Sequence, residues 1–319
     1  MGEALAAAAT ARQRTSPNPW VGAAVVPAGD GPVALGATEP PGGPHAEVVA
    51  LELAGEDAKG ATVYVTLEPC AHHGRTPPCT DALIAAGVGR VVVGTLDPDA
   101  KVAGRGVEAL RAAGIEVEVG VLGDEVEACL EPYLVHRRTG RPYVVLKLAA
   151  TLDGRIAAPD GTSRWITSAP ARADVHRLRA ESDAIVVGAG TVRADDPALT
   201  VRDVEGESPR RVVLGSAPAG AAVHPALEHT GDLCPLLDRL GAEGVLQVLV
   251  EGGAQVAHRF HREGLVNRYV LYLAPALLGG DDGVPLFAGP GAPTMADAWR
   301  GRIVGVSRLG PDVRIDLLP

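Results

Sequence analysis

Four side chains in the N-terminal third of the sequence have the types and order needed for a catalytic metal site. His45 and Glu47 are separated by one residue, and Cys70 and Cys79 follow later in the chain. One imidazole and two thiolates bind Zn²⁺ and leave the fourth tetrahedral position for water, which the metal makes acidic enough to give hydroxide near neutral pH. A carboxylate that is not a ligand can then move protons. We therefore predict hydrolysis at a zinc site, with His45, Cys70 and Cys79 as ligands and Glu47 as the catalytic proton carrier.

The order of these residues narrows the reaction. His-x-Glu, followed by Pro-Cys and a second cysteine, is the signature of zinc-dependent nucleobase deaminases. Taken singly, His45 is typical of a surface histidine, and either cysteine could be a buried thiol. His72 and His73 lie between the cysteines and could compete as ligands, but the usual set is complete without them. A closed structural zinc site is disfavoured because such a site has no use for Glu47.

The elements that must position these residues alternate between strands and helices. We expect strands at 21–26, 62–66, 90–94 and 115–119, and helices at 45–54, 80–86 and 106–113. Strands separated by helices of this length indicate a mostly parallel sheet with helices on its faces. At 319 residues the chain favours two domains. We place the boundary in the charged stretch from Arg137 to Pro142, giving domains at residues 1–140 and 141–319.

A second series of α/β elements follows this boundary. The expected strands and helices are 143–149, 171–180 (helix), 184–188, 211–214, 246–250, 254–262 (helix), 269–274 and 313–317. Gly188 and Gly190 come close to a dinucleotide-binding fingerprint, but Arg193 stands where its third glycine belongs. The sequence therefore does not favour a Rossmann domain.

Composition limits the classes of partner. The formal net charge of -10 disfavours binding to nucleic acid, which depends on clustered Lys and Arg. No apolar run approaches the ~20 residues that cross a membrane, and the alanine-rich start lacks the features of a signal peptide. Four cysteines in a chain of this size do not indicate a disulfide framework, so Cys129 and Cys234 are interpreted as small core thiols. We expect a cytoplasmic protein.

The spacing of the two cysteines is the most informative departure from common deaminases. Eight residues separate them instead of two, and the string from Glu68 to Cys79 closely resembles that of the bifunctional deaminase/reductase family of riboflavin biosynthesis. The resemblance implies a cytidine-deaminase-like α/β/α sandwich that deaminates a phosphoribosylated diaminopyrimidinone and releases ammonia. Thr38 stands where the family usually carries a histidine, seven residues before His45. The implied substrate-binding residues are Asn18, His72, His73 and Arg75.

The second half is similar to the reductase part of the same family, whose α/β fold is like dihydrofolate reductase. The matching strings are Lys147 to Gly154, Ser163 to Thr167, Asp195 to Arg202, and Val250 to Gly253. The resemblance implies hydride transfer from NADPH to C1′ of the ring-opened ribosylamino group, with Lys147 as a catalytic residue. The implied cofactor contacts are Ala149, Trp165, Thr191, Asp195, Ser216, Gly252 and Gly253. The implied substrate contacts are Asp153, Ser163, Arg179, Leu199, Arg202 and Glu251.

The leading hypothesis is therefore a bifunctional enzyme with Zn²⁺ and NADPH as cofactors, a small phosphorylated pyrimidine as substrate, and a homo-oligomeric assembly. The alternative is a deaminase whose C-terminal half is only a structural or oligomerisation module. The stretch 216–233, which is shorter than usual in the family, favours that alternative. A nucleic-acid base deaminase is a third hypothesis, against which the cysteine spacing and the acidic charge both count.

Overall fold

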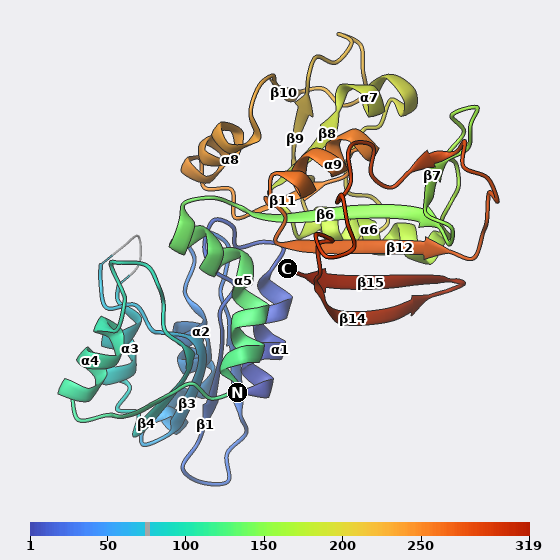
Figure 1. Cartoon of the computed structure of the whole chain (residues 1–319). Helices are drawn as coiled ribbons and strands as arrows, with labels where there is room; N and C mark the ends of the chain where they lie inside the picture. Colours follow the sequence, from blue (N-terminus) through green and yellow to red (C-terminus); the bar gives the residue numbers. More distant parts are fainter. Residues whose placement is uncertain (74–76) are drawn as a thin grey trace. The chain divides into compact units, whose positions relative to one another are not determined.

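The computed structural model describes residues 1–73 and 77–319 and divides the chain into two compact units. Unit 1 runs from Met1 to Arg141 and unit 2 from Pro142 to Pro319. The expected boundary between residues 140 and 141 lies one residue before this division. Figure 1 shows a separate sheet in each unit, and each unit is described by itself.

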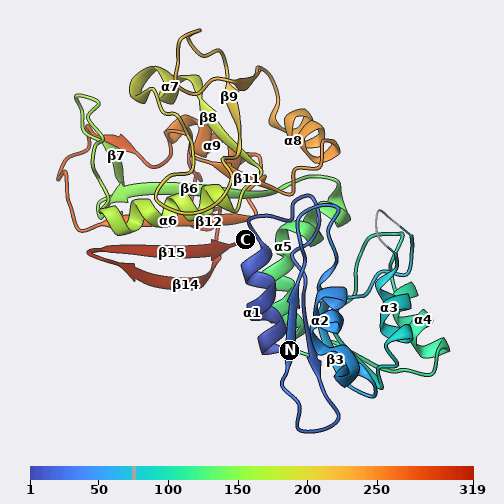
Figure 2. The ribbon, with the colours of Figure 1, turned by 180° about the vertical axis from the view of Figure 1, so that it is seen from behind.

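Unit 1 is a three-layer α/β/α sandwich. Its sheet has the order β2-β1-β3-β4-β5, where β3, β4 and β5 are parallel and β1 is antiparallel to both neighbours. Helices α1 and α5 lie along one face, and α2, α3 and α4 cover the other, as Figures 1 and 2 show. The elements are α1 (Gly2–Ala11), β1 (Gly22–Val26), β2 (Ala34–Ala37), α2 (Ala46–Ala54), η1 (Gly55–Ala58), β3 (Thr62–Leu67), α3 (Cys79–Ala85), β4 (Arg90–Thr95), α4 (Arg105–Ala112), β5 (Glu116–Val119) and α5 (Gly123–Thr139).

The predicted sandwich is confirmed, and the sheet is parallel only over β3, β4 and β5. The antiparallel pair β1–β2 is a hairpin, because the seven residues 27–33 are too few for the crossover that parallel neighbours need. Four elements of unit 1 were not predicted from the sequence: α1, β2, η1 and α5. Helix α5 ends at Thr139, so the first half of the charged stretch in which the boundary was placed is helical.

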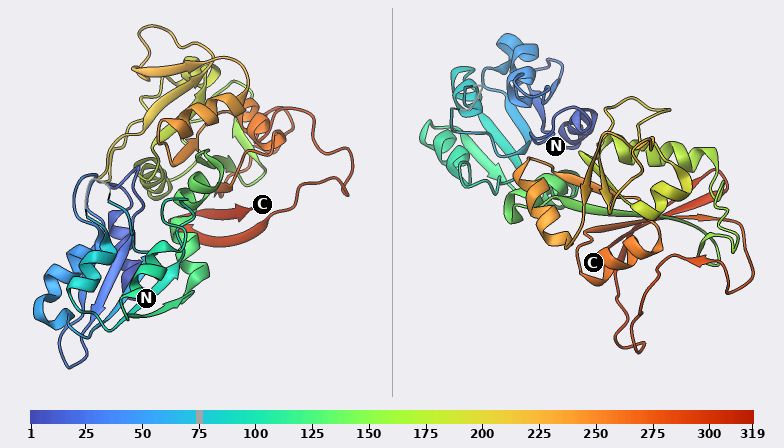
Figure 3. Two further views of the ribbon diagram at one scale, coloured as in Figure 1. Left: turned by 90° about the vertical axis from the view of Figure 1, so that its left-hand side faces the viewer. Right: turned by 90° about the horizontal axis from the view of Figure 1, so that it is seen from above.

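Unit 2 is built on an eight-stranded sheet of order β10-β9-β8-β11-β6-β12-β15-β14. The strands from β10 to β12 are parallel, while β15 and β14 are antiparallel additions at one edge. The right-hand view of Figure 3, from above, shows α6 (yellow-green) on one face of the sheet and α9 (orange) on the other. The strands of unit 2, of which β7 and β13 pair in a separate two-stranded sheet, are β6 (Tyr143–Thr151), β7 (Arg155–Ala157), β8 (Ala184–Gly188), β9 (Arg210–Leu214), β10 (Ala226–His229), β11 (Gln247–Val250), β12 (Arg268–Ala274), β13 (Val284–Pro285), β14 (Arg302–Leu309) and β15 (Asp312–Leu318).

The helices of unit 2 are α6 (Ala169–Ala180), α7 (Ala189–Asp195), α8 (Leu233–Ala242) and α9 (Ala254–Arg262). Alternate residues of the central strands point to opposite faces of the sheet. Leu146, Leu148 and Val250 join the core formed with α8 and α9. The face that carries Lys147 is the one on which α6 packs, because Tyr272 of β12 donates a hydrogen bond to Asp174 of α6.

The short stretch 216–233 contributes an edge strand. β10 lies within it and pairs in parallel with β9, with Leu227 opposite Val212. The short stretch therefore still forms a strand at this edge of the sheet. None of the helices in residues 1–73 and 77–319 is long and apolar enough to span a bilayer.

Candidate functional site

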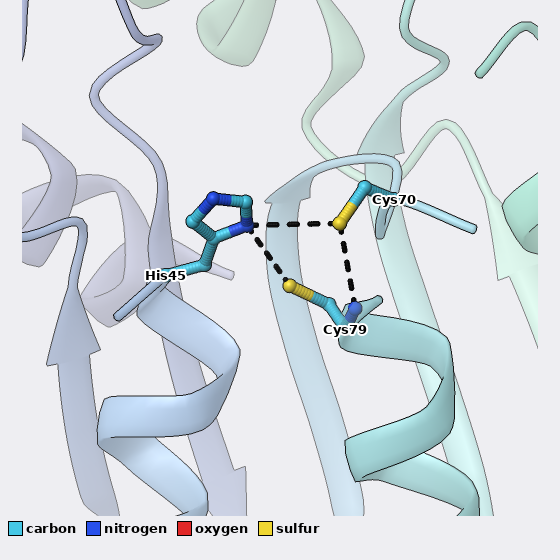
Figure 4. A group of neighbouring side chains, drawn as sticks. All are labelled: His45, Cys70 and Cys79. Carbon is cyan, nitrogen blue, oxygen red and sulfur yellow. Dashed lines mark hydrogen bonds between the residues drawn. The ribbon is translucent and has the colours of Figure 1, made fainter. Parts of the chain in front are cut away.

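The three predicted metal ligands converge at one point of unit 1 (Figure 4). His45 Nδ1 lies 3.1 Å from Cys79 Sγ and 3.7 Å from Cys70 Sγ, and all three ligand atoms lie within 4.8 Å of one another. Zn–S bonds of about 2.3 Å and a Zn–N bond of about 2.0 Å separate neighbouring tetrahedral ligands by roughly 3.5–3.8 Å. The arrangement therefore fits Zn²⁺ with three protein ligands and one position left for water.

Local backbone structure places His45. It is the residue before the first turn of α2, in an extended conformation with φ -78° and ψ 164°. Helix α2 approaches β2 closely because residue 36 is glycine: a Cβ there would collide with the Ala46 carbonyl oxygen. Thr38 is 3% exposed, and its hydroxyl accepts a hydrogen bond from the Val21 N–H at 3.1 Å. Thr38 therefore joins the hairpin that supports α2, which is a structural use of the position.

Glu68 holds the other side of the site. Its carboxylate is 4% exposed and accepts hydrogen bonds from the backbone N–H groups of Asp97, Gly104, Gly106 and Val107, at 2.9 to 3.3 Å. Two of these donors belong to the first turn of α4, so a residue next to Pro69 and Cys70 caps that helix. In the sequence, Glu68 is recognisable only as part of a motif. Its capping role had no local signal, because its partners lie 29 or more residues away.

Electrostatics in the cluster match the proposed roles. Hydrogen bonds from Cys79, and then from His45, lower the pKa of Cys70 to about 4, against the opposing effect of burial. A hydrogen bond to Cys70 raises the pKa of His45. Burial raises the pKa of Glu47, which is 3% exposed and also hydrogen-bonds with Cys79. A carboxyl group with a raised pKa beside the ligands is suited to accept and return protons.

One of the predicted substrate residues of unit 1, Asn18, precedes His45 in the sequence, and the other three lie between Cys70 and Cys79. Asn18 is half-buried in a turn, where its N–H donates to the Thr15 carbonyl oxygen at 2.8 Å. His72 and His73 are exposed, and the metal-ligand group found among the described residues includes neither of them. Arg75 lies outside the described residues. The four assignments stay predictions.

A second polar cluster lies on the α6 side of the sheet in unit 2. Arg179 of α6 donates two hydrogen bonds to the Glu251 carboxylate, at 2.6 and 3.0 Å, and Lys147 Nζ lies 3.8 Å from the same carboxylate. Burial lowers the pKa of Lys147 despite the nearby Glu251 charge. Burial alone would raise the pKa of Glu251, but the charges of Arg179 and Lys147 lower it. The structure thus brings together three of the predicted reductase residues.

The predicted cofactor residues follow the carboxyl ends of parallel strands. Gly252 and Gly253 follow β11 and precede α9, Ser216 follows β9, and Thr191 lies in α7 directly after β8. Parallel strands place these ends on one edge of the sheet, where ligands of α/β proteins usually bind. A Cβ on Gly190 would have no atom within 4 Å, and one on Gly253 would only touch the Thr191 hydroxyl. The backbone there is open to a pyrophosphate at the start of α9, so the edge fits a dinucleotide.

Trp165 and Asp195 each contact an arginine side chain. The ring of Trp165 is 70% exposed, and the Arg172 guanidinium lies 4.4 Å from its centroid. Arg164 donates to the Asp195 carbonyl oxygen at 2.7 Å. An exposed indole of this kind offers a flat apolar face to a ligand. Ala149 lies two residues after Lys147 on β6 and shares its face of the sheet.

Of the remaining predicted substrate residues, Asp153 and Arg202 form hydrogen bonds within the protein. Asp153 accepts hydrogen bonds from the Thr151 hydroxyl at 2.5 Å and from two backbone N–H groups of residues 278 and 279. Leu199 is 4% exposed, and Ser163 is half-buried. Arg202 donates to the Thr200 hydroxyl at 2.9 Å. These roles stay predictions.

Comparisons with known proteins agree over the whole chain. A family model described as "RibD C-terminal domain" matches residues 142–315, and one described as "Cytidine and deoxycytidylate deaminase zinc-binding region" matches residues 1–95. The chain is 43% identical to riboflavin biosynthesis protein RibD of Escherichia coli, over 100% of this chain and 98% of that protein. It is 44% identical to RibD of Mycobacterium tuberculosis, over 100% and 96% respectively.

Solved structures give the same result. Acinetobacter baumannii RibD superimposes with a TM-score of 0.92 at 39% identity, covering 100% of this chain and 97% of that chain. The Thermotoga maritima protein described as a diaminohydroxyphosphoribosylaminopyrimidine deaminase/5-amino-6-(5-phosphoribosylamino)uracil reductase does so with a TM-score of 0.89 at 36% identity, with the same coverage. With its zinc-ligand cluster in unit 1 and its C-terminal domain match in unit 2, this chain belongs to the RibD family of riboflavin biosynthesis proteins.

Proposed function

We propose that this chain catalyses two successive steps of riboflavin synthesis on one phosphorylated pyrimidine. Unit 1 deaminates the phosphoribosylated diaminopyrimidinone, and unit 2 reduces the ribosyl side chain of the product to ribityl. The observation that carries the proposal is that each unit has its own cluster of buried or half-buried reactive groups: Glu47 beside His45, Cys70 and Cys79, and Lys147 beside Glu251.

In unit 1 the chain's own residues move protons and hold the ring. Zn²⁺, when bound, supplies the Lewis acidity that activates water. Glu47 carries one proton of that water to the ring nitrogen and the second to the amino group, which leaves as ammonia; its raised pKa suits it to this repeated transfer. The half-buried amide of Asn18 hydrogen-bonds the base, and the polar loop between the cysteines holds the phosphate.

In unit 2 the fixed charges act at the ribose. NADPH, when bound, supplies the hydride. Lys147 donates the proton that the ribose ring oxygen needs when the ring opens, and Glu251 keeps the ammonium in place. The lowered pKa of Lys147 makes it a better acid than an exposed lysine. Because Arg179 is already paired with Glu251, we assign binding of the substrate phosphate to Arg202.

We also propose that the enzyme is cytoplasmic and that it forms a homo-oligomer. A small phosphorylated substrate and NADPH point to a cytoplasmic enzyme without nucleic-acid partners. The sheet edge formed by β14 carries exposed Ile303, Val304 and Val306 side chains, which supports a homo-oligomer that covers them. Light scattering of the purified protein measures the assembly.

One assay tests the two activities separately. The pyrimidine substrate is added to the zinc-loaded protein, and ammonia and NADPH oxidation are recorded independently. We expect both signals from the native protein, and an unchanged ammonia signal with NADPH oxidation at least a hundredfold slower in Lys147→Ala. Ammonia release without NADPH oxidation by the native protein would select the deaminase-only alternative. Loss of both activities in Lys147→Ala would contradict the division into two sites.

A further inference from the structure

The loop at residues 199–203 of unit 2 has an unusual backbone. Leu199 and Asp203, neither of which is glycine, have positive φ values of 54° and 64°. The left-handed region is unfavourable for residues with a Cβ, so contacts elsewhere must hold the loop in this shape. The loop carries Arg202, which the proposed function assigns to the substrate phosphate. The contacts that hold the loop therefore determine the position of the Arg202 guanidinium.

Two side chains one turn apart on α6 hold this loop. Arg179 donates to the Thr200 carbonyl oxygen at 3.2 Å while it stays paired with Glu251. The backbone N–H of Arg202 donates to His176 Nδ1 at 3.1 Å. His176 is 7% exposed, so little water is available to replace this acceptor. Of the two contacts, only the one from His176 reaches residue 202 itself.

We propose that His176 is a positioning residue of the reductase step, whose neutral imidazole fixes the backbone at Arg202 and so sets the guanidinium for the anionic group of the substrate. The inference rests on the proposed function of unit 2, because Arg202 has a phosphate to bind only if that function is right. His176 was not among the residues singled out from the sequence.

The protonation state of His176 follows from the geometry. Nδ1 accepts a hydrogen bond, so the ring proton of the neutral form resides on Nε2, which lies 3.8 Å from Asp203 Oδ2. A proton added to Nδ1 would face the Arg202 N–H, donor against donor, and the contact would be lost. The charged groups that face the imidazole are Arg179, Arg202, Asp203 and Glu251.

These surroundings favour the neutral ring. Burial lowers the pKa of His176, and the charges of Arg179 and Arg202 lower it further, whereas Asp203 and Glu251 oppose them. His176 is therefore neutral at pH 7 and above, and the loop is held there. As the pH falls below the ordinary histidine range toward this lowered pKa, the ring becomes charged and the loop is released.

Two amide substitutions at residue 176 distinguish the hydrogen-bond acceptor at Nδ1 from the rest of the imidazole ring. His176→Asn places an amide oxygen where Nδ1 was, while His176→Gln places its amide near the position of Nε2. We measure KM and kcat for NADPH oxidation with the deaminated, phosphorylated substrate at pH 7.5. His176→Gln should raise KM about tenfold with kcat changed less than threefold, the effect of losing one well-placed hydrogen bond. His176→Asn should restore KM to within about threefold of the native value.

The pH profile is a readout that general loss of structure would not reproduce. In the native protein, KM for the phosphorylated substrate should rise as the pH falls from 7 to 5. In His176→Asn this histidine-dependent rise should be absent, because the amide does not titrate. With the dephosphorylated substrate, native protein and His176→Gln should have the same KM, because the positioned guanidinium then has no anion to bind.

Each negative outcome has a distinct meaning. If the native protein does not oxidise NADPH, the proposed function of unit 2 is wrong, whatever the variants do. If the native protein is active and His176→Gln keeps its native KM and pH profile, the positioning role is overturned. Ammonia release and the melting temperature are recorded for every variant. A KM that rises equally in Asn and Gln variants would also contradict the proposal, because the acceptor would then be irrelevant.

Discussion

Glu47 is a carboxyl group in surroundings that make its charged form costly. It is 3% exposed, and burial raises its pKa; the charge of His45 and a hydrogen bond with Cys79 oppose this rise, whereas the charge of Cys70 adds to it. A carboxylate buried for stability alone would be an unfavourable choice, since burying a charge costs free energy. Burial next to the metal ligands instead suits a group that accepts and returns protons, because it raises the pKa of the carboxyl group.

The first prediction concerns this residue. Glu47→Gln keeps the shape and removes the exchangeable proton, so ammonia release should fall by about 10²- to 10⁴-fold while bound zinc stays at one ion per chain. Ammonia release and metal content are measured on the same preparation. A variant with full zinc and ammonia release within tenfold of the native rate would remove Glu47 from proton transfer.

The sequence predicted the metal site well, but it did not predict the residues that support the two reactive sites, for a physical reason. His45, Glu47, Cys70 and Cys79 are recognisable because metal binding restricts side-chain type and spacing. Glu68 accepts a hydrogen bond from the backbone N–H of Gly104, which lies 36 residues later in the chain, and His176 accepts one from the backbone N–H of Arg202, which lies 26 residues later. Any residue except proline carries that donor, so the partner leaves no mark in the sequence.

At the scale of elements, the start of α4 is pressed against the segment that leads to Cys70. A Cβ on Gly106 would collide with the Pro69 carbonyl oxygen, while the Gly106 N–H donates to Glu68 at 2.9 Å. The helix can therefore cap itself on Glu68 only because this position has no side chain. Helix, cap and ligand segment form one unit of structure.

The second prediction follows from this packing. Alanine is the better helix former by about 1 kcal/mol, but in Gly106→Ala the collision should prevail and lower the free energy of unfolding by about 1–3 kcal/mol. Zinc affinity should fall as well, because Pro69 must move and Cys70 follows it. Urea unfolding and metal titration measure the two effects. Gly29→Ala, where a Cβ meets no atom within 4 Å, is the control and should change neither; stable, zinc-replete Gly106→Ala would contradict the argument.

Elements with clear patterns were predicted almost to the residue, as α9 at Ala254–Arg262 shows. Helix α1 was not predicted because its run of alanines has little contrast between faces. Helix α5 was not predicted because it contains Pro132 and begins after Leu122, which has a positive φ of 53° and supplies no capping side chain. Tertiary packing overrides the local signal in both helices.

At the scale of the molecule, the two reactive clusters belong to different compact units. His45, Cys70 and Cys79 lie within Met1–Arg141, and Lys147 and Glu251 within Pro142–Pro319. Each unit has its own sheet. The chemistry of one therefore need not depend on the metal of the other.

The third prediction is a separation of activities on metal removal. Treatment with a strong zinc chelator, followed by its removal, should abolish ammonia release and leave NADPH oxidation of the already deaminated substrate within about twofold, because reduction uses no group that the metal activates. Added Zn²⁺ should restore ammonia release. A parallel loss of both activities would show that unit 2 depends on zinc.

The position of β6 has a consequence for synthesis on the ribosome. It is the first strand of unit 2, yet it lies in the interior of the sheet, between β11 and β12, whose pairing residues Gln247 and Arg268 come about a hundred residues later. At roughly 5–20 residues per second, its two edges stay unpaired for about 5–20 s after it emerges. The segment Tyr143–Leu146 is wholly apolar and buried in the finished protein. Nascent unit 2 should therefore need shielding from aggregation while unit 1, complete by Arg141, is already free to fold.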